Sequence, residues 1–214
     1  MSTELSEGVR VGADGKARCW WPGDDELYVA YHDDEWGRPV RDDHRLFEKL
    51  CLEGFQSGLS WLTILRKRPR FRGVFHGFDP AQIAVFGDED VERLMNDAGI
   101  VRNRAKILAT INNARRYAEL VTETGSLAAF LWSYEPPAES RPTSLDYDTL
   151  MSFGVSAESK RLSKDLRKRG WAFVGPTTVY AAMEAMGIVN DHLDGCFARA
   201  IVDAERANFV RPVA

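Results

Sequence analysis

The chain has 214 residues, enough for one domain or two small ones. Its 28 Lys and Arg residues and 32 Asp and Glu residues give a net charge of −4, and 44% of the residues are hydrophobic. This composition excludes a disordered chain, a collagen and a small disulfide scaffold. No apolar run approaches the roughly 18–20 residues that a bilayer span needs, and the first residues lack the apolar stretch of a secretory signal. Three cysteines are too few for a disulfide framework, so we expect a reduced, cytoplasmic protein without membrane contact.

In chain order, residues 1–18 are polar and lack periodicity, which predicts a disordered leader. From residue 19 onward helical periodicity dominates and convincing strand alternation is absent, so we expect an all-α fold. The expected organisation is a single domain over residues 19–206, followed by a tail at 207–214. The expected helices cover residues 44–56, 59 to a stop at Pro69, 88–97, about 104–121, 157–169 after an N-cap at Ser156, 176–186 before Gly187, and roughly 191–205.

Basic residues gather in three runs along the chain. Residues 66–72 carry five bases and no acid, residues 99–116 carry five more without an acid, and residues 160–169 carry six bases and one acid. A polyanion responds to such local patches rather than to the net charge. Each run alone fits a solvated helix face, but together they predict a surface that faces phosphate groups.

Soft metal ligands lie at both ends of the predicted domain. His192 and Cys196 are four residues apart, so on a helix both side chains would leave the same face. Cys19 and His32 lie thirteen residues apart near the other end. Two Cys and two His can form a closed tetrahedral zinc site, which would be structural because no position stays open for water. On spacing alone, buried cysteines and unrelated histidines explain the pattern equally well.

One carboxylate stands among apolar and aromatic residues. Glu53 follows the run LFEKLCL, Trp61 comes eight residues later, and Tyr28, Tyr31 and Trp36 crowd the segment LYVAYHDDEW. An anion beside flat rings suits a cationic or electron-poor heterocycle, because the rings stack on it and the anion accepts its hydrogen bonds. Core packing of the aromatics and a solvated glutamate remain the simpler interpretation of the pattern alone.

Residues 88–121 combine an acidic helix, a short turn at 98–101 and a basic helix. Such a turn can direct backbone N–H groups and the positive end of the second helix at a phosphate. An ordinary packed helical hairpin would give the same pattern.

These three sites, in this order, resemble the DNA-3-methyladenine glycosylase I family of the helix-hairpin-helix DNA glycosylase superfamily. The resemblance covers residues 19–196 and is carried by CWWPGDDELYVAYHDDEWG (19–37), LFEKLCLEGFQSGLSW (46–61), DAGIVRNRAKI (97–107), KRGWAFVGPTTVYAAMEAMG (168–187) and NDHLDGC (190–196). It implies the glycosylase fold, with one structural Zn²⁺ per chain joining segments 19–36 and 190–196 through Cys19, His32, His192 and Cys196.

The same resemblance assigns further roles. It implies that an extruded base is recognised by Glu53, Tyr28, Tyr31, Trp36 and Trp61. It also implies that the hairpin grips the DNA backbone, for which we name Gly99, Ile100, Arg102, Arg104 and Lys106. The implied activity is DNA repair by base excision, in which 3-methyladenine is flipped out of alkylated double-stranded DNA and removed by hydrolysis of its N-glycosidic bond. The family-like default is a monomer.

The chemistry of the lesion suggests a mechanism. Methylation at N3 places positive charge on adenine, so the glycosidic bond is already weak and the base leaves neutral. We expect Glu53 to act as the catalytic group by hydrogen-bonding the adenine edge, with Trp61 and Tyr31 stacked on the base, while water attacks the sugar carbon. The usual aspartate of the superfamily has no counterpart, and no lysine in the pocket segments suggests a Schiff base. We therefore expect a monofunctional enzyme that releases free 3-methyladenine and leaves an abasic site.

Two other interpretations stay open. A non-catalytic, zinc-stabilised protein that binds damaged DNA would keep the metal site and the hairpin but would not need Glu53 among aromatics. A hydrolase with a catalytic metal is the third, and four available ligands speak against it. Phe55 departs from the family pattern, in which Gln often follows Glu-Gly, and we expect this to alter the pocket wall. Residues 56–59 are expected to wedge into the gap left in the duplex.

Overall fold

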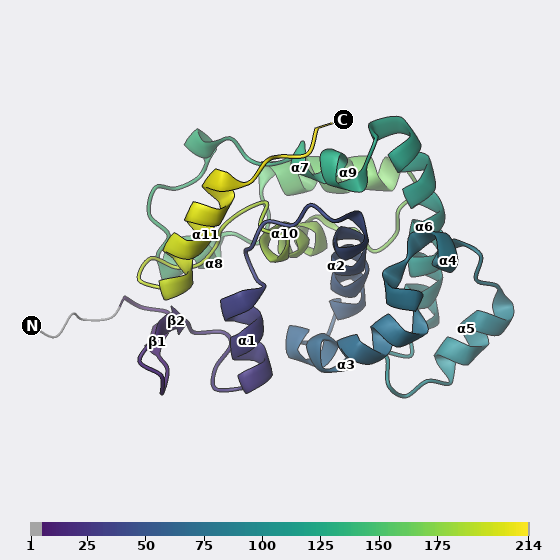
Figure 1. Cartoon of the computed structure of the whole chain (residues 1–214), viewed down its shortest axis with the longest axis horizontal. Helices are drawn as coiled ribbons and strands as arrows, with labels where there is room; N and C mark the ends of the chain where they lie inside the picture. Colours follow the sequence, from purple (N-terminus) through teal and green to yellow (C-terminus); the bar gives the residue numbers. More distant parts are fainter. Residues whose placement is uncertain (1–5, 214) are drawn as a thin grey trace, which may run out of the picture.

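The computed structural model describes residues 6–213, which are mostly helical, as Figure 1 shows. No helix among these residues is long and apolar enough to cross a membrane. The elements in chain order are β1 (Val9–Val11), β2 (Ala17–Cys19), α1 (Glu26–Asp34), α2 (Asp43–Gln56), α3 (Trp61–Val74), η1 (His76–Phe78), α4 (Pro80–Ala84), α5 (Asp88–Met95), α6 (Arg104–Thr124), α7 (Leu127–Trp132), η2 (Ala138–Ser140), α8 (Tyr147–Ser152), α9 (Ala157–Lys168), α10 (Pro176–Ala185) and α11 (Phe197–Asn208).

Helix α2 lies at the centre of the fold (Figure 1) and confirms the helix expected at 44–56. It contacts α3, α6, α7 and α10, and every residue from Leu46 to Phe55 is buried. The buried residues include the charged side chains Glu48, Lys49 and Glu53. Charged side chains are rarely buried unless they are paired or functional. The burial of these three on α2 therefore needs an explanation.

The next helix was expected to stop at Pro69, and this expectation is wrong. Helix α3 continues through Pro69 to Val74. A proline inside a helix removes one backbone hydrogen bond, but Phe71 and Val74 beyond it are buried in the main core. Burial of these apolar side chains offsets the lost hydrogen bond, which the local sequence signal does not reveal.

The expected disordered leader is wrong for the residues that the structure describes. Strands β1 and β2 form an antiparallel hairpin in which Val9 pairs with Cys19 and Val11 with Ala17. Each strand has three residues, which is too short for a visible alternation pattern. Arg18 anchors the hairpin to α1, because its guanidinium donates to Asp33 at 2.7–3.0 Å. Residues 1–5 lie outside the described part.

The last expected helix begins later than the sequence suggested. Helix α11 starts at Phe197, and Gly195 has a φ of 87°, so residues 190–196 form a loop. His192 and Cys196 therefore do not share a helix face. The helices expected at 88–97, 104–121, 157–169 and 176–186 are confirmed to within a few residues, and Ser156 caps α9 as expected.

The elements separate into two ends around α2. The hairpin, α1 and α11 lie together at the left end of Figure 1, and α4, α5 and α6 lie at the right end. Helix α3 runs along the lower edge of this view between the two ends. The two metal-ligand segments thus lie at one end, and the expected DNA-gripping hairpin lies at the other.

Candidate active site

Helices α1, α2 and α3 converge on a cavity of about 420 Å³. The structure brings together all five residues predicted to bind the base, since each lines this cavity. Tyr28 and Tyr31 come from α1, Trp36 follows that helix, Glu53 comes from the last turns of α2, and Trp61 begins α3. The cavity is therefore an aromatic pocket with one predicted carboxylate, which we call the base pocket.

Glu53 is almost completely buried at this pocket, with 5% of its surface exposed. Burial raises the pKa of its carboxyl group to about 8, because the charged form loses its hydration, and nearby Lys49 opposes this shift. Among the described residues no donor hydrogen-bonds the Glu53 carboxylate. A buried acid without a partner is the arrangement expected of a group that awaits a ligand.

The aromatic rings form a connected wall around the carboxylate. The Tyr31 and Trp61 ring centroids are 5.4 Å apart, and those of Trp21 and Trp36 are 5.0 Å apart. The Trp61 indole N–H is buried and has no hydrogen-bond partner among the described residues. Rings at these spacings offer several flat surfaces to a bound heterocycle.

The sequence analysis missed several residues that line the pocket. Trp20 and Trp21 follow Cys19 directly, and their aromatic character next to a candidate metal ligand was the available signal. Glu184 of α10 is a second carboxyl group on the wall, and burial together with the charge of Asp191 raises its pKa well above the usual value. A single acid in the apolar segment VYAAMEAM could have identified it. The α8 region adds the apolar side chains Leu150, Met151 and Phe153.

The expectation that Phe55 alters the pocket wall is wrong. Phe55 is 1% exposed and does not line the base pocket. Its ring packs against Phe71 of α3, with centroids 4.6 Å apart, and lies 6.0 Å from the ring of Phe75. Gln56, the next residue, lines the pocket instead.

The four predicted metal ligands form one buried cluster. The ligand atoms of Cys19, His32, His192 and Cys196 all lie within 4.8 Å of one another. Cys196 Sγ is 3.5 Å from His32 Nε2 and 3.6 Å from His192 Nδ1, and Cys19 Sγ is 3.9 Å from His192 Nδ1. Two sulfur and two nitrogen atoms at these separations could hold a metal ion with tetrahedral coordination.

Neighbouring groups orient both imidazoles of the cluster. His32 Nδ1 lies 2.8 Å from the Asp33 carboxylate, and His192 Nε2 lies 3.1 Å from the backbone oxygen of Trp36. Each ring therefore keeps its other nitrogen for the cluster, which is the usual arrangement around a bound metal. The Trp36 ring also packs edge-on against His192 with centroids 4.6 Å apart, so the Cys/His cluster supports one wall of the base pocket.

Helices α5 and α6 form the expected hairpin, and α3 contacts its turn. Lys67 Nζ donates to the Ala98 carbonyl oxygen at 2.8 Å, and Arg70 pairs with Asp97. The run 66–72 therefore does not offer five free cations, because Arg68 also turns inward to Glu35. Helix α3 links the hairpin turn to the base pocket, where its first residue is Trp61.

The residues expected to grip DNA differ in their availability. The Gly99 N–H donates to Asp97 Oδ1 at 2.8 Å, the Ile100 N–H donates to the Asp97 carbonyl oxygen, and the Ile100 side chain is buried. Arg104 is exposed and pairs with Glu92. Arg102 is exposed, and neither its backbone N–H nor its guanidinium has a partner among the described residues.

Lys106 is a correction to the expected set. Its side chain is buried, and its ammonium group donates to the carbonyl oxygens of Phe55 at 2.8 Å and Ser57 at 2.6 Å. It cannot contact a phosphate in this position. Lys106 instead holds the end of α2 against α6, because the backbone carbonyls there lack helical donors.

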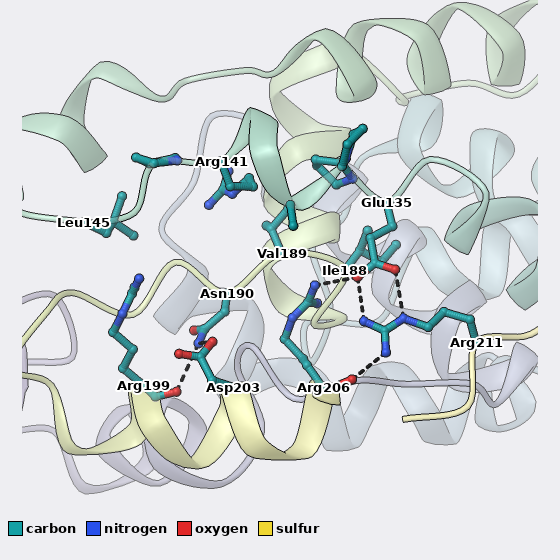
Figure 2. Close-up of a pocket in the computed structure, with 14 residues that line it drawn as sticks. Glu135, Arg141, Leu145, Ile188, Val189, Asn190, Arg199, Asp203, Arg206 and Arg211 are labelled. Carbon is teal, nitrogen blue, oxygen red and sulfur yellow. Dashed lines mark hydrogen bonds and ion pairs between the residues drawn. The ribbon is translucent and has the colours of Figure 1, made fainter. Parts of the chain in front are cut away.

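A second cavity, of about 580 Å³, lies beside α11 and is drawn in Figure 2. Its arginines are already engaged: Arg206 and Arg211 both pair with Glu135, and Arg141 pairs with Asp191. Arg199 pairs with Asp194 and donates to a backbone oxygen. These contacts tie the carboxyl-terminal segment to the core and leave no free guanidinium for a ligand.

A family model described as methyladenine glycosylase matches residues 21–199. The chain belongs to the methyladenine glycosylase family. Escherichia coli (strain K12) DNA-3-methyladenine glycosylase 1 is 48% identical over 180 residues, which are 84% of this chain and 95% of that protein. DNA-3-methyladenine glycosylase from Haemophilus influenzae is 44% identical, over 84% of this chain and 96% of its own length.

Solved structures of methyladenine glycosylases have the same fold as this chain. A crystal structure of 3-methyladenine DNA glycosylase I superposes with a TM-score of 0.78 at 46% identity and covers 85% of this chain and 99% of its own. The Staphylococcus aureus enzyme, solved to explain 3-methyladenine recognition, gives 0.75 at 38% identity over 82% of this chain and 92% of its own. The helical glycosylase fold expected from the sequence is therefore confirmed, with the addition of the short hairpin.

Proposed function

We propose that this chain excises 3-methyladenine from alkylated double-stranded DNA by hydrolysing the N-glycosidic bond. The observation that carries the proposal is the buried, unpartnered carboxyl group of Glu53 inside a wall of aromatic rings. The names of the relatives, which are 44–48% identical, support the same substrate. The names of these two relatives thus suggest the substrate, and the residues of the pocket suggest how it is bound.

The charge of the lesion explains why this pocket suits it. A purine methylated at N3 carries positive charge while it is bound to the sugar, and its departure as a neutral base removes that charge. Stacking between Tyr31 and Trp61 would contribute roughly 0.5–2 kcal/mol per cation–π contact. A cation beside Glu53 would also lower the raised pKa of the carboxyl group, so that the anion forms where it can accept hydrogen bonds from the base.

The remaining steps need water and no covalent enzyme intermediate. As the glycosidic bond breaks, its electron pair leaves with the base, which becomes neutral. Water adds to the sugar carbon and loses one proton to solvent, so an abasic site remains. Lys49, whose ammonium group lies near the Tyr31 and Trp61 rings, does not line the cavity and pairs with Glu35. This placement argues against a Schiff base at Lys49 and supports a monofunctional reaction without strand cleavage.

Binding to the duplex would use the hairpin and the loop after α2. The N-terminus of α6 and exposed Arg102 would meet backbone phosphates. Leu59 is 42% exposed in the loop at 56–59, next to the pocket-lining residue Gln56, and would fill the gap that the flipped nucleotide leaves. Flipping costs a few kcal/mol and least at a damaged pair, which adds to selectivity.

The metal cluster would hold one structural zinc ion. Its two cysteines and two histidines match the preference of zinc for sulfur and nitrogen donors, and four protein ligands leave no position for a reacting water. When bound, the ion would cross-link the chain near residue 19 to the loop at 190–196 and stabilise the folded state.

The test is to incubate methylated duplex DNA with the purified protein and to identify the liberated bases by chromatography. We expect release of 3-methyladenine by the wild-type chain and a loss of at least about 100-fold, equivalent to roughly 2.7 kcal/mol, in Glu53→Gln. Glu48→Gln is a matched control, because Glu48 is equally buried on α2 but pairs with Arg72 away from the pocket. Binding of methylated duplex without any base release would favour the non-catalytic alternative.

A further inference from the structure

Lys49 is a buried cation that the proposed reaction does not use. It lies one helical turn before Glu53 on α2, and its side chain is 4% exposed. Its Nζ pairs with Glu35 and lies 3.4 Å from the Tyr31 hydroxyl oxygen. The same nitrogen is 4.6 Å from the centroid of the Tyr31 ring and 5.5 Å from that of the Trp61 ring. Lys49 thus contacts both rings proposed to stack on the base without lining the pocket itself.

Glu35 keeps this lysine charged and in place. Arg68 Nη1 lies 2.6 and 2.8 Å from the two Glu35 oxygens, so one carboxylate holds two cations. Although burial opposes its ionisation, Lys49 and Arg68 lower the pKa of Glu35 to about 2. Burial lowers the pKa of Lys49, and the Glu35 carboxylate opposes this by favouring the ammonium form. The charged groups facing Lys49 are therefore Glu35 from the α1 side, Glu53 on α2 and Arg68 from α3.

The contact with Lys49 decides where the Tyr31 hydroxyl can donate. A tyrosine hydroxyl has one hydrogen to donate and an oxygen that can accept at the same time. An ammonium group has three hydrogens to donate and no lone pair to accept with, so the Tyr31 oxygen must be the acceptor from Lys49. No other described residue hydrogen-bonds this hydroxyl, and Tyr31 lines the pocket. Its own hydrogen is therefore left for a ligand.

We propose that Lys49 is a positioning residue that fixes the Tyr31 hydroxyl as a hydrogen-bond donor to an acceptor atom of the purine in the base pocket. This proposal rests on the proposed base-excision function. The pocket then presents a donor at Tyr31 and an acceptor at Glu53, which together match a purine edge that carries both kinds of group. Lys49 acts only through Tyr31, since it does not line the cavity.

A purely structural role for Lys49 predicts a different result from a positioning role. A structural ion pair stabilises the contact between α1 and α2 whether or not Tyr31 carries a hydroxyl group. A positioning lysine matters for base binding only while that hydroxyl is present. The two roles are separated by a double-mutant cycle that measures ligand affinity rather than stability.

The experiment uses Lys49→Met, Tyr31→Phe and the double variant of the full chain. Lys49→Met keeps the length of the side chain, and Glu35 retains Arg68 as a partner. Affinity for free 3-methyladenine is measured by quenching of tryptophan fluorescence, with single-turnover base release from methylated duplex as a second readout. We expect each single variant to bind about 5–10-fold more weakly, the size of one net hydrogen bond, and the double variant to be no weaker than Tyr31→Phe.

Controls separate the possible failures. Glu48→Gln removes a buried charge one residue away and should leave affinity unchanged, and thermal melting verifies that each variant is folded. If Lys49→Met does not fold, Lys49→Gln replaces it in the same cycle, because its amide can still donate to Tyr31 and should retain more affinity than Tyr31→Phe. Losses that multiply in the double variant, or unchanged affinity in Lys49→Met, would overturn the role of Lys49 alone. If Lys49→Gln is used instead, an affinity as low as that of Tyr31→Phe would overturn it. A wild-type chain that neither binds 3-methyladenine nor releases it would overturn the proposed function as well.

Discussion

The Asp33 carboxylate lies 2.8 Å from His32 Nδ1, on the side of the imidazole that does not face the cysteine sulfurs. Arg18 of strand β2 donates to the same carboxylate, and Asp14 in the hairpin turn accepts from Arg18 in addition. The orientation of one candidate metal ligand is thus set by the short hairpin that precedes α1. The hairpin is therefore connected to the Cys/His cluster through Asp33.

We predict that Asp33→Asn weakens metal binding by about 10–100-fold, because His32 loses the anion that orients its ring and raises its basicity. Competition with a chromophoric zinc chelator would measure the affinity. Asp34→Asn is the matched control, since Asp34 is the exposed neighbour on the same helix. Equal affinities in the two variants would contradict the role of Asp33.

We expect removal of the metal to lower the stability of the fold more than the rate of base excision. We expect Cys196→Ala, or treatment with a strong chelator, to reduce the melting temperature markedly, because the link between the two chain segments is lost. Excision should remain measurable at low temperature, where the metal-free chain still folds. Abolished turnover with an intact fold would instead indicate a catalytic metal.

Glu53 should make stability fall as pH rises. Its carboxyl group has a folded-state pKa of about 8 and a usual value of 4.5, so between these values the folded state binds more protons than the unfolded state. The free energy of unfolding then decreases from pH 4.5 to about 8 and is flat above that range for this group. Compared with the wild type, Glu53→Gln should therefore have a free energy of unfolding that is roughly 1–3 kcal/mol higher at pH 9 and almost equal near pH 4.5.

Thermal melts of wild type and Glu53→Gln across this pH range would measure the difference. The comparison with Glu48→Gln isolates the effect of the pocket, because Glu48 already has Arg72 as a partner. A gain that is the same at every pH would show that Glu53 is not held in its neutral form.

Arg102 and Lys106 should respond differently in DNA binding. We expect Arg102→Ala to weaken binding of any duplex and to reduce the slope of log affinity against log salt by about 0.9, the value for one phosphate contact. Lys106→Met should leave the slope unchanged, because the ammonium group is buried against Phe55 and Ser57. Fluorescence anisotropy over a range of salt concentrations measures both, and a reduced slope for Lys106→Met would place that lysine at the DNA.

Gly187 should tolerate no side chain. A Cβ there would lie 2.4 Å from the Arg38 carbonyl carbon and 2.5 Å from the Gly37 oxygen, and its φ is +71°. We predict that Gly187→Ala destabilises the fold by about 2–4 kcal/mol, since it adds a backbone clash to the cost of a left-handed conformation. Gly23→Ala is the control, because Gly23 has a φ of +56° but no atom lies within 4 Å of the added Cβ. We expect this variant to lose about 1 kcal/mol of stability, as measured by denaturant unfolding. Similar losses in the two variants would argue against the clash.

The sequence predicts best where a pattern is local. The starts of α9 and α10 were predicted from capping residues, because Ser156, Gly175 and Pro176 determine where a helix begins through contacts within its first turn. It fails where tertiary contacts decide: Pro69 lies inside α3 because the residues beyond it are buried, and the hairpin strands are too short to show alternation.

The functional site shows the same contrast between local patterns, which the sequence reveals, and tertiary contacts, which it does not. The five pocket residues and the four cluster residues were candidates from the sequence pattern, and the family resemblance assigned their roles. The structure brings each set together. The exclusion of Lys106 from the DNA surface and the contact of Lys49 with Tyr31 depend on which way a buried side chain turns. No local signal in the sequence shows that neighbouring helices enclose Lys49 on α2, or that Lys106 on α6 turns towards the end of α2.

Helix α3 begins at Trp61 in the base pocket and carries Lys67, which contacts the hairpin turn, six residues later. Because a helix rises 1.5 Å per residue, these two anchor points are separated by about 9 Å along a rod that does not stretch. Helix α3 therefore fixes the spacing between the base pocket and the turn of the α5–α6 hairpin. One inserted residue would rotate Lys67 by about 100° about the helix axis and turn its side chain away from the Ala98 carbonyl oxygen.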